Sequence, residues 1–536
     1  MGPAILIGWT AGRAAAQDPT AVMDSLFAGM RRTDAPGCVA GVDLNGARVV
    51  RGYGMANLEY AVPLSPESIS ETGSVAKQFT AAAIGLLALR GRLSLDDDIR
   101  KYLPEVPSFD GRTITIRHLL HHTSGLRDQW GLLSIEGHPP GREVHTFGRI
   151  LDLVSRQRML NFSPGDEYLY SNTGYALSAV LVTRVAGKPF AQFTAEELFR
   201  PLGMTHTQWR DDYRRIVPNR ATAYDRQQNA WVQDMPFTMV HGNGGLLTTV
   251  GDLLIWNAAL TAGTVPGGAE LVRMLETPGR LNDGSAIRYA LGLNVDRYKG
   301  VREVSHGGST AGYRTFLARW PERGLSVAIL CNAGTANAGG SAHRIADRLL
   351  ALPAEQQAPA AAEPVAAEEL ERLAGLYRDS TTDQVITIAV RDGRLTVAAS
   401  GPSAPLTHLG EMRFWSGVAG EYRFERLGEH WRVVQFAEGW RRYDPFQRID
   451  AALVRADDYR GRYRSPELEV VVTVEGDSGV SIRPPLAEPV RLTPIYRDGF
   501  AAPGRTIRFM RDAGGRVTGF RIFAGRVRDL RFERVE

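Results

Sequence analysis

The chain has 536 residues, more than one hydrophobic core usually supports, so we expect roughly two to four domains. Hydrophobic residues make up 43% of it and charged residues 23%, as in ordinary globular proteins. The net charge is only +4 and no run of like charges forms a basic patch, which argues against nucleic acid as a partner. No stretch of the sequence approaches the ~20 apolar residues that a membrane span needs.

Residues 1–16 are a candidate remnant of an export signal. A short apolar stretch over residues 4–12 precedes Ala14-Ala15-Ala16, which fits a small-residue cleavage site, although no basic residue comes first. We therefore expect a periplasmic or secreted protein, with the cytoplasm as the alternative. Cys38 and Cys331 each lie in an apolar, strand-like stretch. Two buried free thiols are the favoured interpretation, and a disulfide is the alternative for an exported protein.

Strands and helices are predicted at both ends of residues 17–352. Residues 39–50 predict a hairpin that turns at Asn45-Gly46. An apolar stripe over residues 79–87 predicts a helix that ends at Gly91. Residues 316–317 and 327–330 predict two strands joined by a turn that ends at Gly324. This order predicts a mixed layer of helices and strands.

Ser74-Val-Ala-Lys77 is the strongest chemical signal, because the chain has only four lysines. Three residues are close to one helical turn, so the two side chains share a face. Serine is a poor nucleophile until a base removes its proton. Lys77 acts as that base only if burial or a nearby cation lowers its pKa. The plain alternative is a serine that caps a helix and a lysine on the surface.

Tyr170 and Asn172 follow a Pro164-Gly165 turn, and the sequence predicts a loop that presents both side chains. A phenol is a useful proton shuttle only when neighbouring cations, here Lys77, lower its pKa. Judged alone, this pair is equally an ordinary loop tyrosine and asparagine.

His306-Gly307-Gly308 precedes Ser309 and follows a predicted strand. Glycines on an edge strand let a substrate backbone approach closely. The amide that follows Gly308, that of Ser309, can then join the Ser74 amide as an oxyanion hole. The plain alternative is a glycine turn beside a solvated histidine.

Taken together and in this order, the three motifs resemble those of the penicillin-recognising serine hydrolases, over about residues 25–350. The resemblance implies an α+β fold, a β-lactamase/DD-peptidase-like domain in which helices flank an antiparallel sheet and form a separate lobe. It also implies Ser74 as nucleophile, Lys77 as the ammonium that assists the base, Tyr170 as acid/base and Asn172 as a ligand of the substrate amide. The third motif, His306 to Gly308, is similar to that of the D-aminopeptidase and esterase branch.

A linker and a tandem duplication follow the first domain. Residues 353–368 are rich in Ala, Pro, Gln and Glu and predict the linker. Gly375-Leu-Tyr377-Arg378 then recurs 86 residues later as Gly461-Arg-Tyr463-Arg464. We therefore predict two related small antiparallel β-barrels, at residues 369–455 and 456–536.

This layout resembles the bacterial D-aminopeptidases, in which a loop of the last barrel carries an acid that grips the free amine of the substrate. Residues 484–494 match that loop, with Arg491 at the position of the acid and Glu488 as its substitute. An inward-pointing Arg491 would favour a substrate carboxylate instead.

These observations predict a serine hydrolase that forms an acyl-enzyme at Ser74 and releases N-terminal D-amino acids from a small peptide or amide. The alternatives are a carboxylesterase, a weak β-lactamase or DD-carboxypeptidase, and a penicillin- or peptidoglycan-binding protein without turnover. No cofactor or metal is predicted, since His121-His122 and Asp96-Asp97-Asp98 both lack ligand spacing. A peptide, amide or ester is the expected partner, together with a second copy in a homodimer.

Overall fold

A computed structural model describes residues 17–353, 361–399, 403–417, 420–428, 430–436, 446–449, 455–476, 479–484 and 488–535. The candidate export signal, residues 1–16, lies outside these described residues, as do residues 354–360 of the predicted linker.

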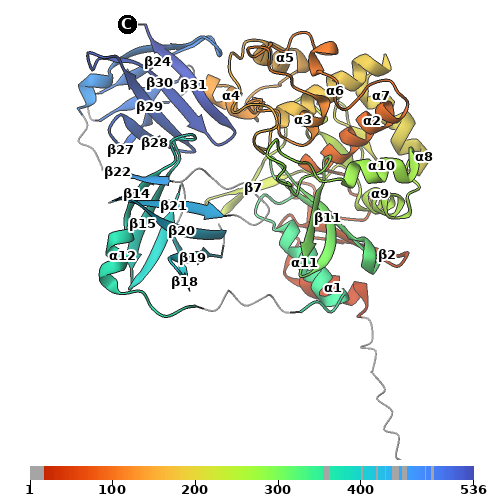
Figure 1. The fold of residues 1–536 in the computed structure, drawn as a ribbon. Helices are drawn as coiled ribbons and strands as arrows, with labels where there is room; N and C mark the ends of the chain where they lie inside the picture. The colour runs from red at the N-terminus through yellow and green to blue at the C-terminus, as the bar shows by residue number, and fades with distance from the viewer. Residues whose placement is uncertain are drawn as a thin grey trace, which may run out of the picture.

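A six-stranded antiparallel sheet, ordered β10-β11-β12-β13-β1-β2, forms the centre of the first domain (Figure 1). The predicted hairpin is present, and Asn45 (φ 52°) and Gly46 (φ 88°) make its turn with the left-handed backbone that such a turn requires. The two strands predicted near the end of the domain are also present and meet at Gly324 (φ 61°). The six strands are β1 (Cys38–Leu44), β2 (Ala47–Tyr53), β10 (Asn294–Tyr298), β11 (Val301–Thr310), β12 (Tyr313–Trp320) and β13 (Leu325–Cys331).

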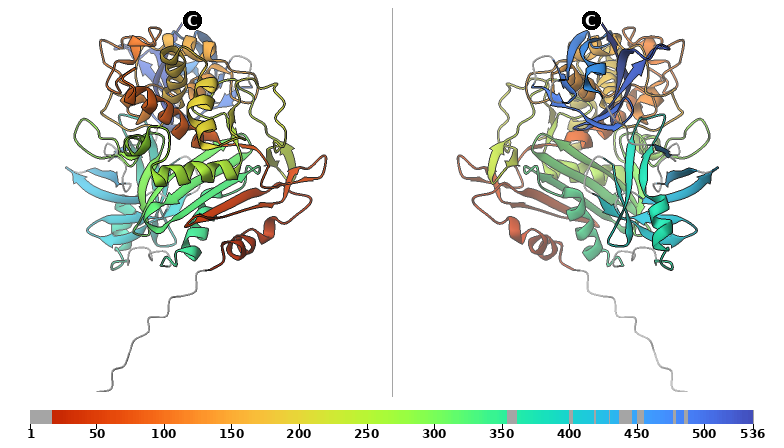
Figure 2. Two further views of the ribbon diagram at one scale, coloured as in Figure 1. Left: turned by 90° about the vertical axis from the view of Figure 1, so that its right-hand side faces the viewer. Right: turned by 90° about the vertical axis from the view of Figure 1, so that its left-hand side faces the viewer.

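Helices cover both faces of this sheet. α1 (Pro19–Leu26) and α11 (Ala338–Leu349) pack on one face, and α9 (Val250–Ala262) packs on the other. Successive side chains of a strand point to opposite faces, so Ala40 and Val42 join the core under α1 and α11 while Val39 joins the opposite core. Figure 2 shows the helical lobe on one side of the sheet and α1 with α11 on the other.

The helical lobe forms between β2 and β10 and surrounds α2 (Lys77–Leu89). Every residue of α2 from Lys77 to Leu87 is buried, as expected for a central helix that is apolar on all sides beyond its first turn. Gly91 (φ 65°) follows its end, as predicted. The other helices are α3 (Ile116–Leu120), α4 (Gln129–Glu136), α5 (Phe147–Ser155), α6 (Asn172–Ala186), α7 (Phe190–Thr194), α8 (Arg200–Leu202) and α10 (Gly268–Glu276). Short strands complete the domain: β3 (Met55–Asn57), β4 (Val62–Pro63), β5 (Ser70–Glu71), β6 (Gln208–Trp209), β7 (Tyr224–Gln227), β8 (Ala230–Gln233) and β9 (Leu246–Thr248).

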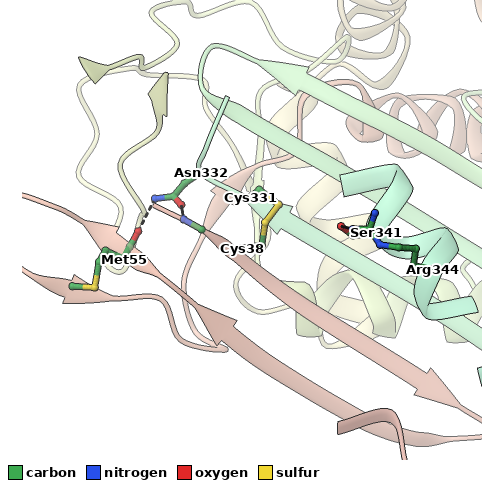
Figure 3. Close-up of a disulfide and its surroundings, with 7 residues drawn as sticks. Cys38, Met55, Cys331, Asn332, Ser341 and Arg344 are labelled. Atoms are coloured by element: carbon green, nitrogen blue, oxygen red, sulfur yellow. Dashed lines mark hydrogen bonds between the residues drawn. A yellow bond between two sulfur atoms is a disulfide. The ribbon is translucent and has the colours of Figure 1, made fainter. Parts of the chain in front are cut away.

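Cys38 and Cys331 form a disulfide, so the favoured prediction of two free thiols was wrong (Figure 3). They lie directly opposite each other because β1 pairs with β13, the last strand of the domain. Local sequence patterns do not reveal that the first and last strands are neighbours. The next residue, Asn332, reinforces this contact: its carboxamide accepts from Gly37 N (2.9 Å) and donates to Met55 O (3.0 Å).

Two nine-stranded antiparallel sheets follow, and their strand orders are identical once the numbering is shifted by one copy. Tyr377 and Tyr463, equivalent in the two copies, donate to the carbonyls of Leu373 (2.8 Å) and Tyr459 (2.7 Å), each four residues earlier. Both copies therefore share their topology and an internal hydrogen bond. The α+β architecture with an antiparallel sheet, a helical lobe and two small antiparallel β units agrees with the prediction.

The strands of the first copy are β14 (Gly375–Arg378), β15 (Val385–Arg391), β16 (Arg394–Ala398), β17 (Ala404–Pro405), β18 (Thr407–Gly410), β19 (Arg413–Ser416), β20 (Gly420–Leu427), β21 (His430–Phe436) and β22 (Phe446–Ile449). Those of the second are β23 (Gly461–Ser465), β24 (Val470–Glu475), β25 (Ser481–Arg483), β26 (Val490–Arg491), β27 (Thr493–Tyr496), β28 (Gly499–Ala502), β29 (Arg505–Arg511), β30 (Val517–Ala524) and β31 (Val527–Arg534).

Two contacts place these copies. α12 (Ala367–Leu373) begins inside the segment predicted as linker, because Leu370 and Leu373 give it an apolar face that joins the core of the first copy. The second copy, blue in Figure 1, lies beside α4 of the helical lobe. Its hairpin β30–β31 contacts that helix, and Val527 fills the space over Gly131. The last domain therefore packs on the part of the lobe that follows Asp128.

Candidate active site

Ser74 and Lys77 lie together at the start of the central helix of the lobe. Ser74 is in a 3-10 turn (Gly73–Ala76), and Lys77 is the first residue of α2. Lys77 Nζ lies 3.1 Å from Ser74 Oγ, 3.0 Å from Asn172 Oδ1 and 2.6 Å from the carbonyl of Asn243. The side chain of Lys77 is fully buried, so the alternative of a surface lysine was wrong.

Burial lowers the pKa of Lys77 well below the ordinary value for lysine, and the charge of Arg526 lowers it further. Asp128 opposes this shift weakly, and no described carboxylate contacts the amine. A neutral amine has two N–H donors and one lone pair. Lys77 Nζ donates to the oxygens of Asn172 and Asn243 and to Ser74 Oγ, and a neutral amine at this place would have its lone pair within reach of the Ser74 proton.

Tyr170 lies against the same lysine, with Lys77 Nζ 4.8 Å from the centre of its ring. Burial raises the pKa of Tyr170, while the Ser74 hydroxyl and the charge of Arg526 only partly oppose this shift. The sequence-based expectation was the opposite, a phenol whose pKa is lowered by cations. It was wrong because burial outweighs the neighbouring charges, so the phenol is protonated at neutral pH. Ser74 is close enough to affect the pKa of this phenol, but no hydrogen bond of good geometry ties the Tyr170 hydroxyl to the described residues.

Asn172 is the first residue of α6 rather than part of a loop, and Asp128 holds it in place. Asp128 Oδ2 accepts from Asn172 N (2.7 Å) and Asn172 Nδ2 (2.9 Å), so Oδ1 of the carboxamide is left to face Lys77. Asp128 also caps the N-terminus of α4. Sequence reasoning did not assign it this role, because an aspartate before a helix signals only a cap.

The glycines of the third motif allow β11 to lie against the turn that carries Ser74. A Cβ atom on Gly308 would lie 2.0 Å from the carbonyl oxygen of Thr72. A Cβ atom on Gly73, which has φ 51°, would lie 2.7 Å from Ser309 N. Both positions therefore require glycine. The close approach brings the backbone amide of Ser309 beside the Ser74 turn.

His306 is buried rather than solvated, contrary to the plain alternative weighed from the sequence. Burial lowers the pKa of His306 to about 4, so it is neutral at pH 7. Its Nε2 lies 3.0 Å from the Tyr289 hydroxyl and its Nδ1 lies 2.5 Å from the Gly307 carbonyl. The arrangement fits a ring that donates from Nδ1 and accepts at Nε2. His306 thus holds β11 in position beside the cavity.

A cavity of about 910 Å³ opens at these groups. Ser74, Tyr170, Asn172 and the segment 306–311 of β11 and its following turn line it. Several charged side chains that sequence reasoning did not single out also line it, among them Asp234, which follows β8, and Arg526, from the turn between β30 and β31.

The last domain reaches the cavity, but neither Glu488 nor Arg491 does; residues 485–487 of the segment predicted from the resemblance lie outside the described residues. Glu488 and Arg491 are exposed, and neither belongs to the residues that line the cavity. Arg491 lies in β26, the edge strand of its sheet, whereas Arg526 lies at the tip of a central hairpin. Two hydrogen bonds hold this tip, since the carbonyl of Arg526 accepts from Asp128 N (3.2 Å) and Asn161 Nδ2 (3.0 Å).

In the described part of the chain, no group of three or more His, Cys, Asp or Glu side chains is arranged to hold a metal ion. No helix among the described residues is long and apolar enough to cross a membrane.

The fold and the serine–lysine–tyrosine site define a serine hydrolase. Residues 23–352 match the Beta-lactamase family, and the chain belongs to that family. It is 26% identical to a D-aminopeptidase of Cereibacter sphaeroides over 525 residues, covering 93% of this chain and 96% of that protein. It is 31% identical to a penicillin-binding protein of Bacillus subtilis over 300 residues, covering 52% of this chain and 64% of that protein.

Solved structures share the fold. The octameric penicillin-binding protein homologue from Pyrococcus abyssi aligns with a TM-score of 0.57 and 23% identity, over 80% of this chain and all of that one. The D-amino acid amidase from Ochrobactrum anthropi SV3 aligns with a TM-score of 0.51 and 22% identity, over 63% of this chain and 98% of that one.

Proposed function

We propose that this serine hydrolase releases an N-terminal D-amino acid from a short peptide or amide. The observation that carries the chemistry is the buried Lys77 amine, 3.1 Å from Ser74 Oγ and beside a protonated Tyr170. The near full-length similarity to D-aminopeptidases, which includes both C-terminal sheets, supports the substrate class.

The geometry suggests how acylation proceeds. Ser74 Oγ attacks the scissile carbonyl carbon and gives its proton to the neutral amine of Lys77. The backbone amides of Ser74 and Ser309 stabilise the negative oxygen that develops. Tyr170 donates its proton to the leaving nitrogen as the C–N bond breaks, and the Lys77 ammonium then restores the proton of the phenol.

Deacylation reverses these roles. Water attacks the ester carbon and passes a proton to Lys77, and Ser74 Oγ regains that proton as the acid leaves. Asn172, held by Asp128, keeps Lys77 in place and offers its carboxamide to the substrate amide.

Asp234 is the best partner for the free amine of the substrate. Of the two acids that line the cavity, Glu71 is engaged by Arg210 in a buried pair (2.8 and 3.0 Å). Asp234 makes no ion pair with a described residue, and Arg314 is the cation close enough to affect its charge. Burial raises the pKa of Asp234. A bound ammonium would lower this pKa again, because it stabilises the charged carboxylate. Asp234 would then take the role that the resemblance implied for Glu488.

The test is release of p-nitroaniline from D-alanine and L-alanine p-nitroanilides by the wild type and by Ser74→Ala. We expect D-selective release that falls by at least ~10³-fold in the variant. Circular dichroism and thermal melting establish that the variant is folded. Substantial turnover by a folded Ser74→Ala protein would exclude the mechanism. Turnover of short-chain esters but of neither anilide would instead favour the carboxylesterase.

We also propose that the protein works in an oxidising compartment, periplasmic or extracellular, and forms a homodimer. The Cys38–Cys331 disulfide supports the first proposal, because disulfides are rare in reducing compartments. Cell fractionation with thiol labelling tests it, since a reduced protein in the cytoplasm would contradict it. Light scattering of the purified protein measures its molar mass, and a mass other than that of two chains would contradict the homodimer.

A further inference from the structure

Arg526 is a cation in the cavity that, apart from lowering the pKa of Lys77, takes no part in the proposed reaction steps. Its guanidinium Cζ lies 4.6 Å from the centre of the Tyr170 ring, and its side chain is 47% exposed. The nearest described carboxylate, that of Asp128, is 3.8 Å away, too far for a hydrogen bond. The oxygen concerned, Oδ2, already accepts two hydrogen bonds from Asn172.

The N–H donors of Arg526 are therefore available to a ligand. A guanidinium has five of them in a planar fork that matches a carboxylate. Within the described residues, only its backbone carbonyl is hydrogen-bonded, to Asp128 and Asn161. The position of Arg526 is nevertheless fixed, because Arg528, two residues on, donates its amide to Asn161 Oδ1 (2.8 Å) and pairs with Glu167 (2.9 Å).

Its place next to Tyr170 shows which part of a substrate it meets. Tyr170 donates to the leaving nitrogen, so a cation stacked on its ring lies on the leaving-group side of the scissile bond. In a dipeptide, the carbon that carries this nitrogen also carries the C-terminal carboxylate. In an amide or an anilide, that carboxylate is missing.

We infer that Arg526 binds the C-terminal carboxylate of the leaving amino acid, and that the preferred substrates are dipeptides with an N-terminal D-residue and a free C-terminus. This inference rests on the proposed function. Two domains would then select the substrate together, since the catalytic domain supplies the nucleophile and the last domain supplies the arginine that binds the substrate carboxylate.

The test compares kcat/KM for D-alanyl-glycine with kcat/KM for D-alanyl-glycinamide, which differ only in the terminal charge. We expect the wild type to favour the acid by roughly 10- to 100-fold, as a charge-assisted bidentate contact implies. In Arg526→Ala this ratio should fall to about one, and Arg526→Lys should retain part of it. The ratio cancels any loss of activity that both substrates share.

Arg531→Ala is the matched control. Arg531 lies on the same hairpin with a 46% exposed side chain and does not line the cavity, so the wild-type ratio should persist. A wild type that hydrolyses D-alanine p-nitroanilide but does not distinguish acid from amide would overturn the inference alone, as would an unchanged ratio in Arg526→Ala. A wild type that hydrolyses no D-amino acid substrate would overturn the proposed function.

Discussion

Arg127 and Glu467 form an ion pair of 2.6 Å that is fully buried between the helical lobe and the last domain. Arg127 also donates to the carbonyls of Arg528 and Asp529, both at 3.0 Å. The residue after Arg127 is Asp128, which holds Asn172. One arginine therefore joins the backbone of the β30–β31 hairpin to the segment that positions the active site.

We predict that Glu467→Gln destabilises the protein by about 3–5 kcal/mol, because it leaves the buried guanidinium of Arg127 without a counter-charge. Denaturant unfolding measures the loss. Glu469→Gln is the matched control two residues away. The carboxylate of Glu469 is 62% exposed and lies 3.7 Å from Arg156, so its loss should lower the free energy of unfolding by at most about 1 kcal/mol. Equal effects of the two variants would contradict this account of the interface.

Lys77→Met should reduce kcat/KM by about 10²- to 10⁴-fold, the usual contribution of a general base. In the wild type, kcat/KM should rise with pH as Lys77 loses its proton. Because burial and the charge of Arg526 lower the pKa of Lys77, this rise should be centred well below the ordinary pKa of lysine. In Arg526→Ala the rise of kcat/KM should move to higher pH. pH–rate profiles of the wild type and this variant check the two expectations, and a wild-type rise centred on the ordinary pKa of lysine would speak against Lys77 as the base.

Asp234→Asn should raise KM for D-alanine p-nitroanilide and lower kcat/KM by about 10- to 100-fold, because the substrate ammonium loses a charged partner. Esters without an amine should be hydrolysed as before, which a parallel assay would show. Asp225→Asn is the control, since Asp225 is close enough to affect the pKa of Asp234 but does not line the cavity. An equal loss with both kinds of substrate would assign Asp234 a structural role.

Acid should destabilise the folded state through three buried histidines. Burial lowers the pKa values of His121, His241 and His306 to about 4, from 6.5 when unfolded. Above pH 6.5 these histidines are neutral in both the folded and the unfolded state, so the free energy of unfolding does not change with their titration. Between pH 6.5 and 4 only the unfolded state takes up protons, so the free energy of unfolding falls by up to about 3 kcal/mol for each group. Urea unfolding between pH 8 and 5 measures this slope.

His241→Gln provides the corresponding control, because glutamine keeps a donor for the Met239 carbonyl but does not titrate. Its unfolding free energy should depend less steeply on pH than that of the wild type. The same slope in both proteins would mean that His241 does not contribute.

The parts of the site that depend on local geometry could be predicted from the sequence. Ser74 and Lys77 are one helical turn apart, so their proximity needs no knowledge of the rest of the fold. The duplication was equally visible, because each copy repeats its own strand pattern. The prediction of a loop at Asn172 was wrong, because the buried carboxylate of Asp128, distant in the sequence, accepts from Asn172 N where the helix begins.

What escaped prediction depends on how separate units pack. The turn at Gly525-Arg526 could be located as the tip of a hairpin, but only docking of the last domain brings it to Tyr170. The rise in the pKa of Tyr170 likewise depends on the summed burial by several elements. Glu488 and Arg491 match a family pattern in which an acid reaches the active site, but neither of these two residues lines the cavity here.

The disulfide joins two cysteines 293 residues apart, and Ser74, Tyr170 and His306 all lie on the chain between them. The catalytic domain is therefore a covalent ring with short tails. A protease that cuts this ring once leaves a single molecule of unchanged mass, apart from one added water, and the two pieces separate only after reduction. Electrophoresis with and without a thiol would thus distinguish a cut inside the ring from one in the C-terminal sheets, which releases its fragment under either condition.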